Sequence, residues 1–275
     1  MEQQIQFPNH RGENLSATIH LPGGPTRRGV ILGHCFTCSR HTTILRSICH
    51  VLADQGFAVL RFDFSGNGQS EGEFADSTYS KQIAEMKTAA AFITGRGVSW
   101  LGLAGHSMGA MVALLAAAEI ASVRVLCALA ARSRVMGAEE ILSPAQLQEL
   151  QGTGRVPFLS RGRALELTRE MFSDAARYDV GRVVSSLSQP LFLVHGDRDE
   201  ITPVDEAYRI QRYRPKGTRL AVIPGADHMF SREDDRRLVT EVVVSWFSEQ
   251  AARTEGRGSV PIPGVKAQGC RWKDK

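Results

Sequence analysis

Apolar residues occur along this chain in short continuous blocks that alternate with longer amphipathic stretches. Short apolar blocks are typical of strands buried on both faces, and the longer stretches indicate helices that cover a sheet. The predicted strands occupy residues 3–7, 14–21, 29–33, 58–64, 99–105, 123–131, 190–195 and 219–223. The predicted helices occupy residues 42–55, 78–94, 108–120 and about 233–250. The first two strands are expected to form an antiparallel edge, and the alternation that follows predicts a mostly parallel sheet with helices on both faces.

Residues 133–188 interrupt this alternation. Helical patterns near 138–150 and 163–177 predict a helical insert, divided by a Gly- and Pro-containing segment. Its apolar residues either line a pocket or form the insert's own core, and helical spacing favours a core. The residues concerned are Met136, Leu142, Leu147, Leu150, Phe158, Leu159, Leu165, Leu167, Met171 and Phe172. Nearby Arg132, Arg134 and Arg155 are interpreted as solvated surface rather than as partners of a substrate carboxylate.

The chemistry of the chain centres on Ser107, in the string Gly-His-Ser-Met-Gly at residues 105–109. A buried strand precedes the serine and a strong helix-forming segment follows it, so the turn between them is tight and strained. Gly105 and Gly109 would let the strand and helix approach closely. This context predicts a nucleophile elbow rather than an ordinary turn, with the Met108 N–H at the helix N-terminus beside the exposed hydroxyl.

A nucleophilic serine needs a base and a group that orients the base, here expected downstream and after strands. The segment after the strand at 190–195 contains Asp197, Asp199 and Glu200, and the one after the strand at 219–223 contains His228. We predict His228 as the base and Asp199 as the acid. Asp197 directly follows the strand, where a carboxylate commonly shapes the turn, and Glu200 is the third alternative.

The other histidines receive structural interpretations. His106 is expected to pack beside the elbow, and His195 to make a structural hydrogen bond at the end of its strand. His10, His20 and His50 stand in no motif.

Several segments of the chain resemble the alpha/beta-hydrolase superfamily, over about residues 3–250. They are HCFT at 34–37, FDFSGNGQSEG at 62–72, GHSMG at 105–109, HGDRDEITP at 195–203 and GADHMF at 225–230. The resemblance implies an alpha/beta-hydrolase fold in which the insert at 133–188 is a lid over the pocket. Within the superfamily the chain looks most like small cinnamoyl and feruloyl esterases. Its HCFTCSR stretch looks like hydrolase domains fused to peroxide-reducing modules, and no such module is expected here.

An acyl-transfer site also needs two N–H donors for the developing oxyanion. The resemblance makes Phe36 the second backbone donor beside Met108. The chain departs from the family pattern at Cys35, where glycine is common. The resemblance thus implies a serine esterase in which Ser107, His228 and Asp199 act on a small-molecule ester. Thioesters and small amides are alternative substrates. A non-catalytic binding module of the same fold is the alternative from another class.

The loop at 34–41 reads H-C-x-x-C-x-x-H, a spacing compatible with zinc, and its Cys35 and Cys38 alone are compatible with a redox pair. Neighbouring ligands such as His34 and Cys35 usually point in different directions, and the context is not that of a thioredoxin. The sequence interpretation is therefore that these are thiols with no chemical role. We predict no metal, and because no phosphate-binding loop is present we predict no cofactor.

Composition and charge lead to the remaining predictions, which concern the cellular location and the C-terminal tail. The five cysteines, with no secretory signal or apolar run of roughly 18 residues, favour a soluble cytoplasmic protein without a membrane partner. The net charge of +4 resides in residues 252–275, which carry six basic and two acidic side chains. This tail has no periodicity and is predicted to be disordered and solvated rather than to bind nucleic acid, leaving one hydrolase domain at 1–251. A monomer or small homo-oligomer is expected.

Overall fold

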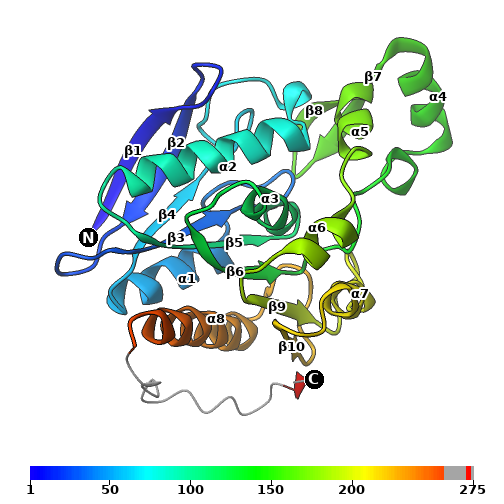
Figure 1. The fold of residues 1–275 in the computed structure, drawn as a ribbon. Coiled ribbons are helices and arrows are strands. Elements are labelled where there is room, and N and C mark those ends of the chain that lie inside the picture. Colours follow the sequence, from blue (N-terminus) through cyan, green and yellow to red (C-terminus); the bar gives the residue numbers. More distant parts are fainter. Residues whose placement is uncertain (257–270, 274–275) are drawn as a thin grey trace.

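The computed structural model describes residues 1–256 and 271–273, and within them a nine-stranded sheet carries the fold (Figure 1). Its strands lie in the order β1-β2-β4-β3-β5-β6-β9-β10-β11. The bounds are β1 Glu2–Pro8, β2 Asn14–His20, β3 Arg28–Gly33, β4 Ala58–Phe62, β5 Trp100–His106, β6 Val123–Leu129, β9 Leu191–Gly196, β10 Thr218–Ile223 and β11 Arg271–Lys273. The six central strands pair in parallel, namely β4, β3, β5, β6, β9 and β10, whereas β1, β2 and β11 pair antiparallel at the two edges. The predicted mostly parallel sheet is confirmed.

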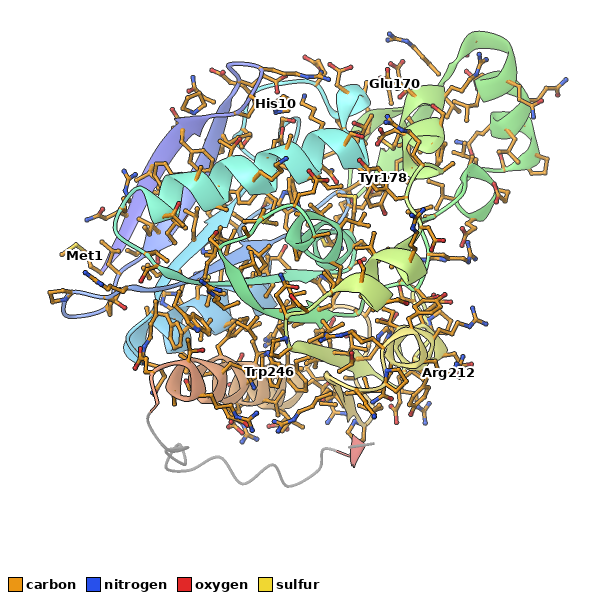
Figure 2. All side chains as sticks on the ribbon, viewed as in Figure 1. Met1, His10, Glu170, Tyr178, Arg212 and Trp246 are labelled. Atoms are coloured by element: carbon orange, nitrogen blue, oxygen red, sulfur yellow. A yellow bond between two sulfur atoms is a disulfide. The ribbon has the colours of Figure 1, made fainter. Side chains whose placement is uncertain are left out.

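Helices cover both faces of this sheet. Helices α1 (Thr43–Asp54) and α8 (Glu233–Thr254) lie on one face, and α2 (Tyr79–Thr94) and α3 (Met108–Ala117) lie on the other (Figure 1). Helices α6 (Val180–Ser186) and α7 (Asp205–Tyr213) complete the second layer, and the short helix η1 (Phe74–Asp76) precedes α2. Trp246, labelled in Figure 2, shows how the first layer docks, because it projects from α8 and donates a hydrogen bond to the Leu126 carbonyl at 3.0 Å.

Successive residues of the central strands enter two separate cores, one on each face. On β3, Val30 and Leu32 join the cluster under α1 and α8, while Ile31 between them joins the cluster under α2 and α3. All three side chains are buried. A strand buried on both faces in this way leaves no room for polar alternation, which is why its sequence is a continuous apolar block.

The insert between β6 and β9 contains a β-hairpin that the sequence pattern did not predict. Its elements before α6 are η2 Ala138–Glu140, α4 Pro144–Thr153, β7 Arg155–Ser160, β8 Arg163–Thr168 and α5 Arg169–Ala175. The predicted helix over 163–177 is thus wrong at its start, because Arg161 and Gly162 both adopt positive φ and turn the chain back. The predicted helix near 138–150 is also divided, since Ser143 caps a new helix that begins at Pro144.

The structure differs from the disordered tail predicted at 252–275 in the two parts of the tail that it describes, residues 252–256 and 271–273. Helix α8 continues to Thr254, whose Oγ1 accepts a hydrogen bond from Trp100 Nε1 at 3.2 Å. Glu255 pairs with Arg28 across the surface, at 2.7 Å from Arg28 Nε. Strand β11 pairs with β10, and such a short backbone-paired edge strand leaves no pattern in the sequence. Residues 257–270 and 274–275, where the rest of this prediction falls, lie outside the described residues.

Candidate active site

Ser107 occupies a strained turn between β5 and α3. Its backbone dihedrals are φ 55° and ψ −117°, a combination that residues with a side chain rarely adopt. The Ser107 N–H donates to the Leu129 carbonyl at 2.8 Å, which ties the turn to β6. The strand–turn–helix context predicted for an elbow is present, and it directs the serine away from the sheet.

The two glycines of the elbow are required by close backbone contacts. A Cβ atom on Gly109 would lie 2.4 Å from the carbonyl carbon of Gly33, and one on Gly105 would lie 2.3 Å from that of Gly109. Real Cβ atoms do not approach backbone this closely. The first turn of α3 therefore packs directly on β3 and β5, which fixes the height of Ser107 above the sheet.

His228 and Asp199 meet above the ends of β10 and β9. His228 Nδ1–H donates to Asp199 Oδ2 at 2.8 Å. The other oxygen, Asp199 Oδ1, accepts from the backbone N–H groups of Ile201 at 3.0 Å and Thr202 at 2.7 Å. Both side chains are buried, so the imidazole orientation and tautomer are set by a carboxylate that is itself held rigidly.

Asp199 is held ionised in this position. Burial is the largest single influence and on its own would raise the pKa of Asp199, but hydrogen bonds from His195 and His228 act against it. The nearby His228 charge and the Thr202 N–H lower the pKa further, and the result lies well below the usual range of an aspartate. The negative charge is therefore available to stabilise a positive charge on His228.

The alternative acids occupy other positions. Asp197 Oδ1 accepts the Gly225 N–H at 2.6 Å and so joins the two loops that carry Asp199 and His228. Glu200 is exposed. The structure thus brings Asp199, the acid predicted from the sequence, against His228, and it does not bring Asp197 there.

His106 and His195 support the site from beneath. His106 Nε2 lies 2.7 Å from the His228 carbonyl. Burial, and to a smaller extent the charge of the neighbouring His228, lower the pKa of His106 to about 3. A neutral His106 therefore donates this hydrogen bond and fixes the His228 backbone. His195 Nε2 lies 2.7 Å from the Thr202 carbonyl and 3.3 Å from Asp199 Oδ2, so it holds the acid loop. Both contacts agree with the structural interpretation.

A cavity of about 440 Å³ joins these groups. Ser107, His228, Phe36 and Met108 all line it. Among the described residues, the Ser107 hydroxyl and the N–H groups of Phe36 and Met108 make no hydrogen bond. The residues that carry these three unengaged polar groups line one cavity, and such groups are those that can bind a reacting carbonyl.

The remaining wall of the cavity is mostly apolar and comes largely from the insert. Phe158, Met171 and Phe172 line it and also belong to, or pack against, the hydrophobic cluster of the insert, whereas Leu142 and Leu150 lie in that cluster without lining the cavity. The predicted alternatives of pocket and core are therefore not exclusive, because three of these residues serve both. Leu159, adjacent to Phe158, is 77% exposed and belongs to neither.

Two polar residues of this wall come from α2 and were not singled out in the sequence. Burial raises the pKa of Tyr79 to about 12, so its hydroxyl stays protonated. Gln82 is buried, and neither its amide nitrogen nor its amide oxygen has a hydrogen-bond partner among the described residues. Their spacing of three along one helix is the only signal that the sequence offers. Of the arginines, Arg132 lines the cavity and pairs with Glu140, whereas Arg155 pairs with Glu166 on the surface.

The interpretation of Cys35 and Cys38 as inert thiols is corrected, because the structure joins them in a disulfide. The C-x-x-C spacing was compatible with a bonded pair, and the folded loop shows that the two sulfur atoms are joined. A zinc site is also disfavoured by His34, whose Nδ1–H donates to the Cys35 carbonyl at 2.7 Å and whose Nε2 accepts the Phe64 N–H at 3.0 Å. Both ring nitrogens are used. Cys49 and Cys127 remain buried thiols, and Cys270 lies outside the described residues.

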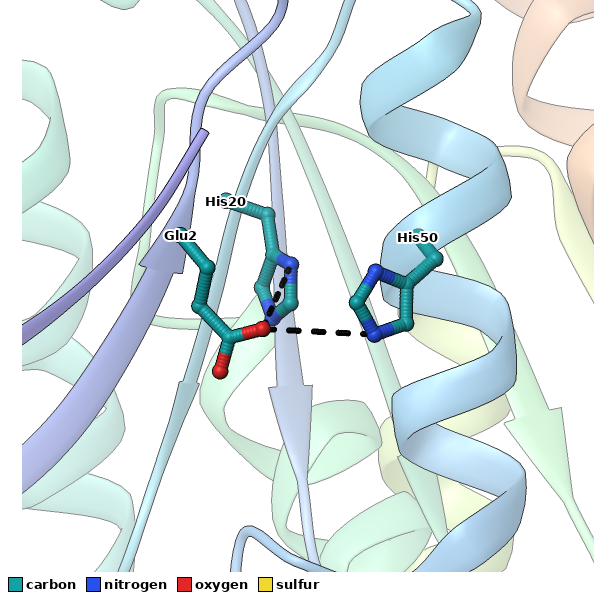
Figure 3. A group of neighbouring side chains, drawn as sticks. All are labelled: Glu2, His20 and His50. Atoms are coloured by element: carbon teal, nitrogen blue, oxygen red, sulfur yellow. Dashed lines mark ion pairs between the residues drawn. The ribbon is translucent and has the colours of Figure 1, made fainter.

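The described residues contain one group with the side chains for a metal, Glu2, His20 and His50 (Figure 3). Glu2 Oε2 lies 3.9 Å from His20 Nδ1 and 4.0 Å from His50 Nε2. However, Arg61 Nε–H donates to His20 Nε2 at 3.0 Å, so neutral His20 carries its proton on Nδ1, the atom that faces Glu2. Arg61 also pairs with Glu2 at 3.0 Å. The group is therefore a hydrogen-bonded network around a buried cation rather than a metal centre.

Comparison with known proteins agrees with this architecture. A family model described as the alpha/beta hydrolase family matches residues 19–242. The esterase domain of a Rhodothermus marinus protein superposes with a TM-score of 0.72 at 26% identity, over 92% of this chain and 98% of that domain. Est1E from Butyrivibrio proteoclasticus, in a structure with ferulic acid bound, superposes with a TM-score of 0.76 at 26% identity, over 90% and 99%.

A curated relative matches a shorter segment. A monoacylglycerol lipase of Mycolicibacterium smegmatis is 35% identical over 64 residues, and the match spans 23% of each chain. No helix among the described residues has the length and apolar character needed to cross a bilayer.

Proposed function

Since the chain belongs to the alpha/beta hydrolase family, we propose that it is a serine hydrolase that cleaves carboxylic esters through an acyl-enzyme. One observation carries the proposal. A serine held in a strained turn opens into the same cavity as a buried His228–Asp199 pair whose hydrogen bond measures 2.8 Å. A fold needs neither the strain nor the buried pair for stability, so their coincidence points to chemistry.

Each residue has a defined role in the proposed reaction. Ser107 Oγ attacks the ester carbonyl while His228 Nε2 takes its proton, and Asp199 stabilises the resulting imidazolium without being protonated. The N–H groups of Phe36 and Met108 bind the oxyanion. His228 then returns the proton to the leaving alcohol, and water attacks the acyl-enzyme by the same route. Apart from the ester and water, these steps use only groups of the chain, and no cofactor is required.

The substrate class follows from the cavity and from the neighbours. Two structures at 26% identity, named as an esterase domain and as Est1E with ferulic acid, support ester chemistry. The apolar wall provided by Phe158, Met171 and Phe172 suits an acyl group of moderate size. We therefore place the acyl chain against the insert, which acts as a lid in this proposal.

The proposal is tested by replacing the nucleophile. Ser107→Ala is expected to lower kcat/KM for p-nitrophenyl butyrate by about 10⁴-fold or more, because covalent catalysis is lost while the oxyanion donors remain. Turnover is measured above the spontaneous hydrolysis of the ester, and circular dichroism checks that the variant is folded. Unchanged turnover in Ser107→Ala would contradict the proposal.

Thioesters and small amides are alternative substrates of the same triad. A matched series of one acyl group as oxygen ester, thioester and anilide, compared by kcat/KM, separates them. We expect the oxygen ester to give the highest value among the three, after correction for the intrinsic reactivity of each leaving group. The non-catalytic binding module does not account for the strained Ser107.

A further inference from the structure

We propose that the Cys35–Cys38 disulfide is a positioning element of the oxyanion hole, so that hydrolysis depends on the oxidation state of this pair. The inference rests on the proposed function. The two cysteines bracket Phe36, whose N–H is the proposed second oxyanion donor. Their Cα atoms lie 5.2 Å apart, and the Cys38 N–H donates to the Cys35 carbonyl at 3.1 Å. The disulfide thus closes a four-residue turn that carries the donor at its second position.

The two ends of this loop are anchored by buried groups. At one end, the His34 ring donates to the Cys35 carbonyl at 2.7 Å. At the other end, the Arg40 N–H donates to Asp63 Oδ1 at 2.5 Å, and the Arg40 guanidinium pairs with the same buried carboxylate. These contacts do not depend on the disulfide, so reduction is expected to leave the loop attached to the sheet.

The middle of the loop is held differently. Thr37 Oγ1 contacts Ser160 Oγ at 2.8 Å, which ties it to the hairpin of the insert. The Phe36 ring packs against Phe74 and Phe158, with centroids 5.4 and 6.2 Å away. These contacts hold side chains, whereas the direction of the Phe36 N–H bond depends on the plane of the peptide unit between Cys35 and Phe36. The carbonyl of that peptide accepts from the His34 ring, which reduction leaves in place, and from the Cys38 N–H at 3.1 Å. The disulfide holds the second of these bonds by fixing the distance across the turn, because a turn can exist without its closing hydrogen bond.

Both cysteines also line the cavity that contains Ser107. A small dithiol in this cavity reaches the sulfur atoms by thiol–disulfide exchange. Its thiolate attacks one sulfur and breaks the Sγ–Sγ bond, and its second thiol releases the mixed disulfide. The dithiol leaves as a cyclic disulfide after giving up two electrons and two protons, and Cys35 and Cys38 become thiols.

The expected consequence is a change in kcat rather than in KM. An oxyanion donor contributes mainly in the transition state, and removing one costs on the order of 10²–10³ in kcat. Because reduction would displace the Phe36 N–H without deleting it, we expect kcat to fall about ten- to a hundredfold. KM is expected to change by less than about threefold, since the acyl-binding wall is untouched.

The experiment compares oxidised and dithiothreitol-treated protein, with the Cys35–Cys38 bond assigned by mass spectrometry of unreduced peptides. The expected results are the fall in kcat, its recovery on reoxidation, and a parallel loss of affinity for an alkylboronic acid that binds as a tetrahedral adduct. A purely structural disulfide would instead lower the melting temperature and leave boronate affinity per folded molecule unchanged. That result would overturn the inference.

Two variants provide the control. Cys35→Ser/Cys38→Ser is expected to match reduced wild-type protein and to ignore dithiothreitol, whereas Cys127→Ala, which removes a buried thiol outside the site, is expected to keep the full response. A double variant as active as oxidised wild-type protein would contradict the inference while leaving the proposed function intact. Oxidised wild-type protein that hydrolyses no ester would end the proposed function, and this inference with it.

Discussion

The loops at the ends of β5, β9 and β10 and the insert between β6 and β9 border the same cavity but are held in place by different forces. At the elbow, backbone packs on backbone, so that a single Cβ on Gly109 would collide with Gly33. The insert instead packs through side chains: the hydrophobic cluster around its Val156 and Leu167 includes Phe74 of η1, and its Ser160 contacts Thr37. The proposed catalytic residues are therefore held by backbone packing on the sheet, whereas the proposed acyl-binding wall is held by side-chain contacts.

The largest effect is expected when the acid at the end of β9 is altered. Asp199→Asn should lower kcat by about 10⁴-fold, as in the serine-protease triad, because the wrong His228 tautomer is then stabilised. The matched control Asp197→Asn keeps an acceptor for the Gly225 N–H and should retain kcat within a few-fold. Steady-state kinetics on one ester decides between them. If Asp197→Asn were inactive and Asp199→Asn active, the assignment of the acid would be reversed.

A smaller and different effect is expected in the insert. Phe158→Ala removes an apolar wall of the cavity, so KM for a medium-chain ester should rise about tenfold with little change in kcat. Leu159→Ala is the matched control, because this neighbouring side chain is 77% exposed and lies outside the cavity. Equal effects of the two substitutions on KM, or a loss of kcat alone in Phe158→Ala, would show that the insert is not the recognition element.

The same division explains what could be predicted from the sequence. The sheet and the order of Ser107, Asp199 and His228 were predictable, because buried parallel strands leave continuous apolar blocks and the site residues follow those blocks directly. The preference for Asp199 over Asp197 was also recoverable, since a carboxylate adjoining the strand end serves the turn, as the Gly225 contact shows.

The rest depends on contacts that are distant in sequence or too short to leave a pattern. The hairpin β7–β8 has only six residues in each strand, and its alternation was overridden by neighbouring helical spacing. The Cys35–Cys38 bond becomes apparent only in the folded loop, which is held at its ends by His34 and Arg40 and brings the two sulfur atoms together. The unpartnered amide of Gln82 becomes notable only once α2 is placed beside the cavity.

The most direct test of the central claim is the reactivity of Ser107 toward a fluorophosphonate, because only a serine activated by a base reacts readily with it. We expect a single adduct, mapped to Ser107 by peptide mass spectrometry, that forms far more slowly in Asp199→Asn and is absent in Ser107→Ala. A folded wild-type protein that forms no adduct, or one that reacts at another residue, would contradict the proposed role of Ser107 and favour a binding module built on this fold.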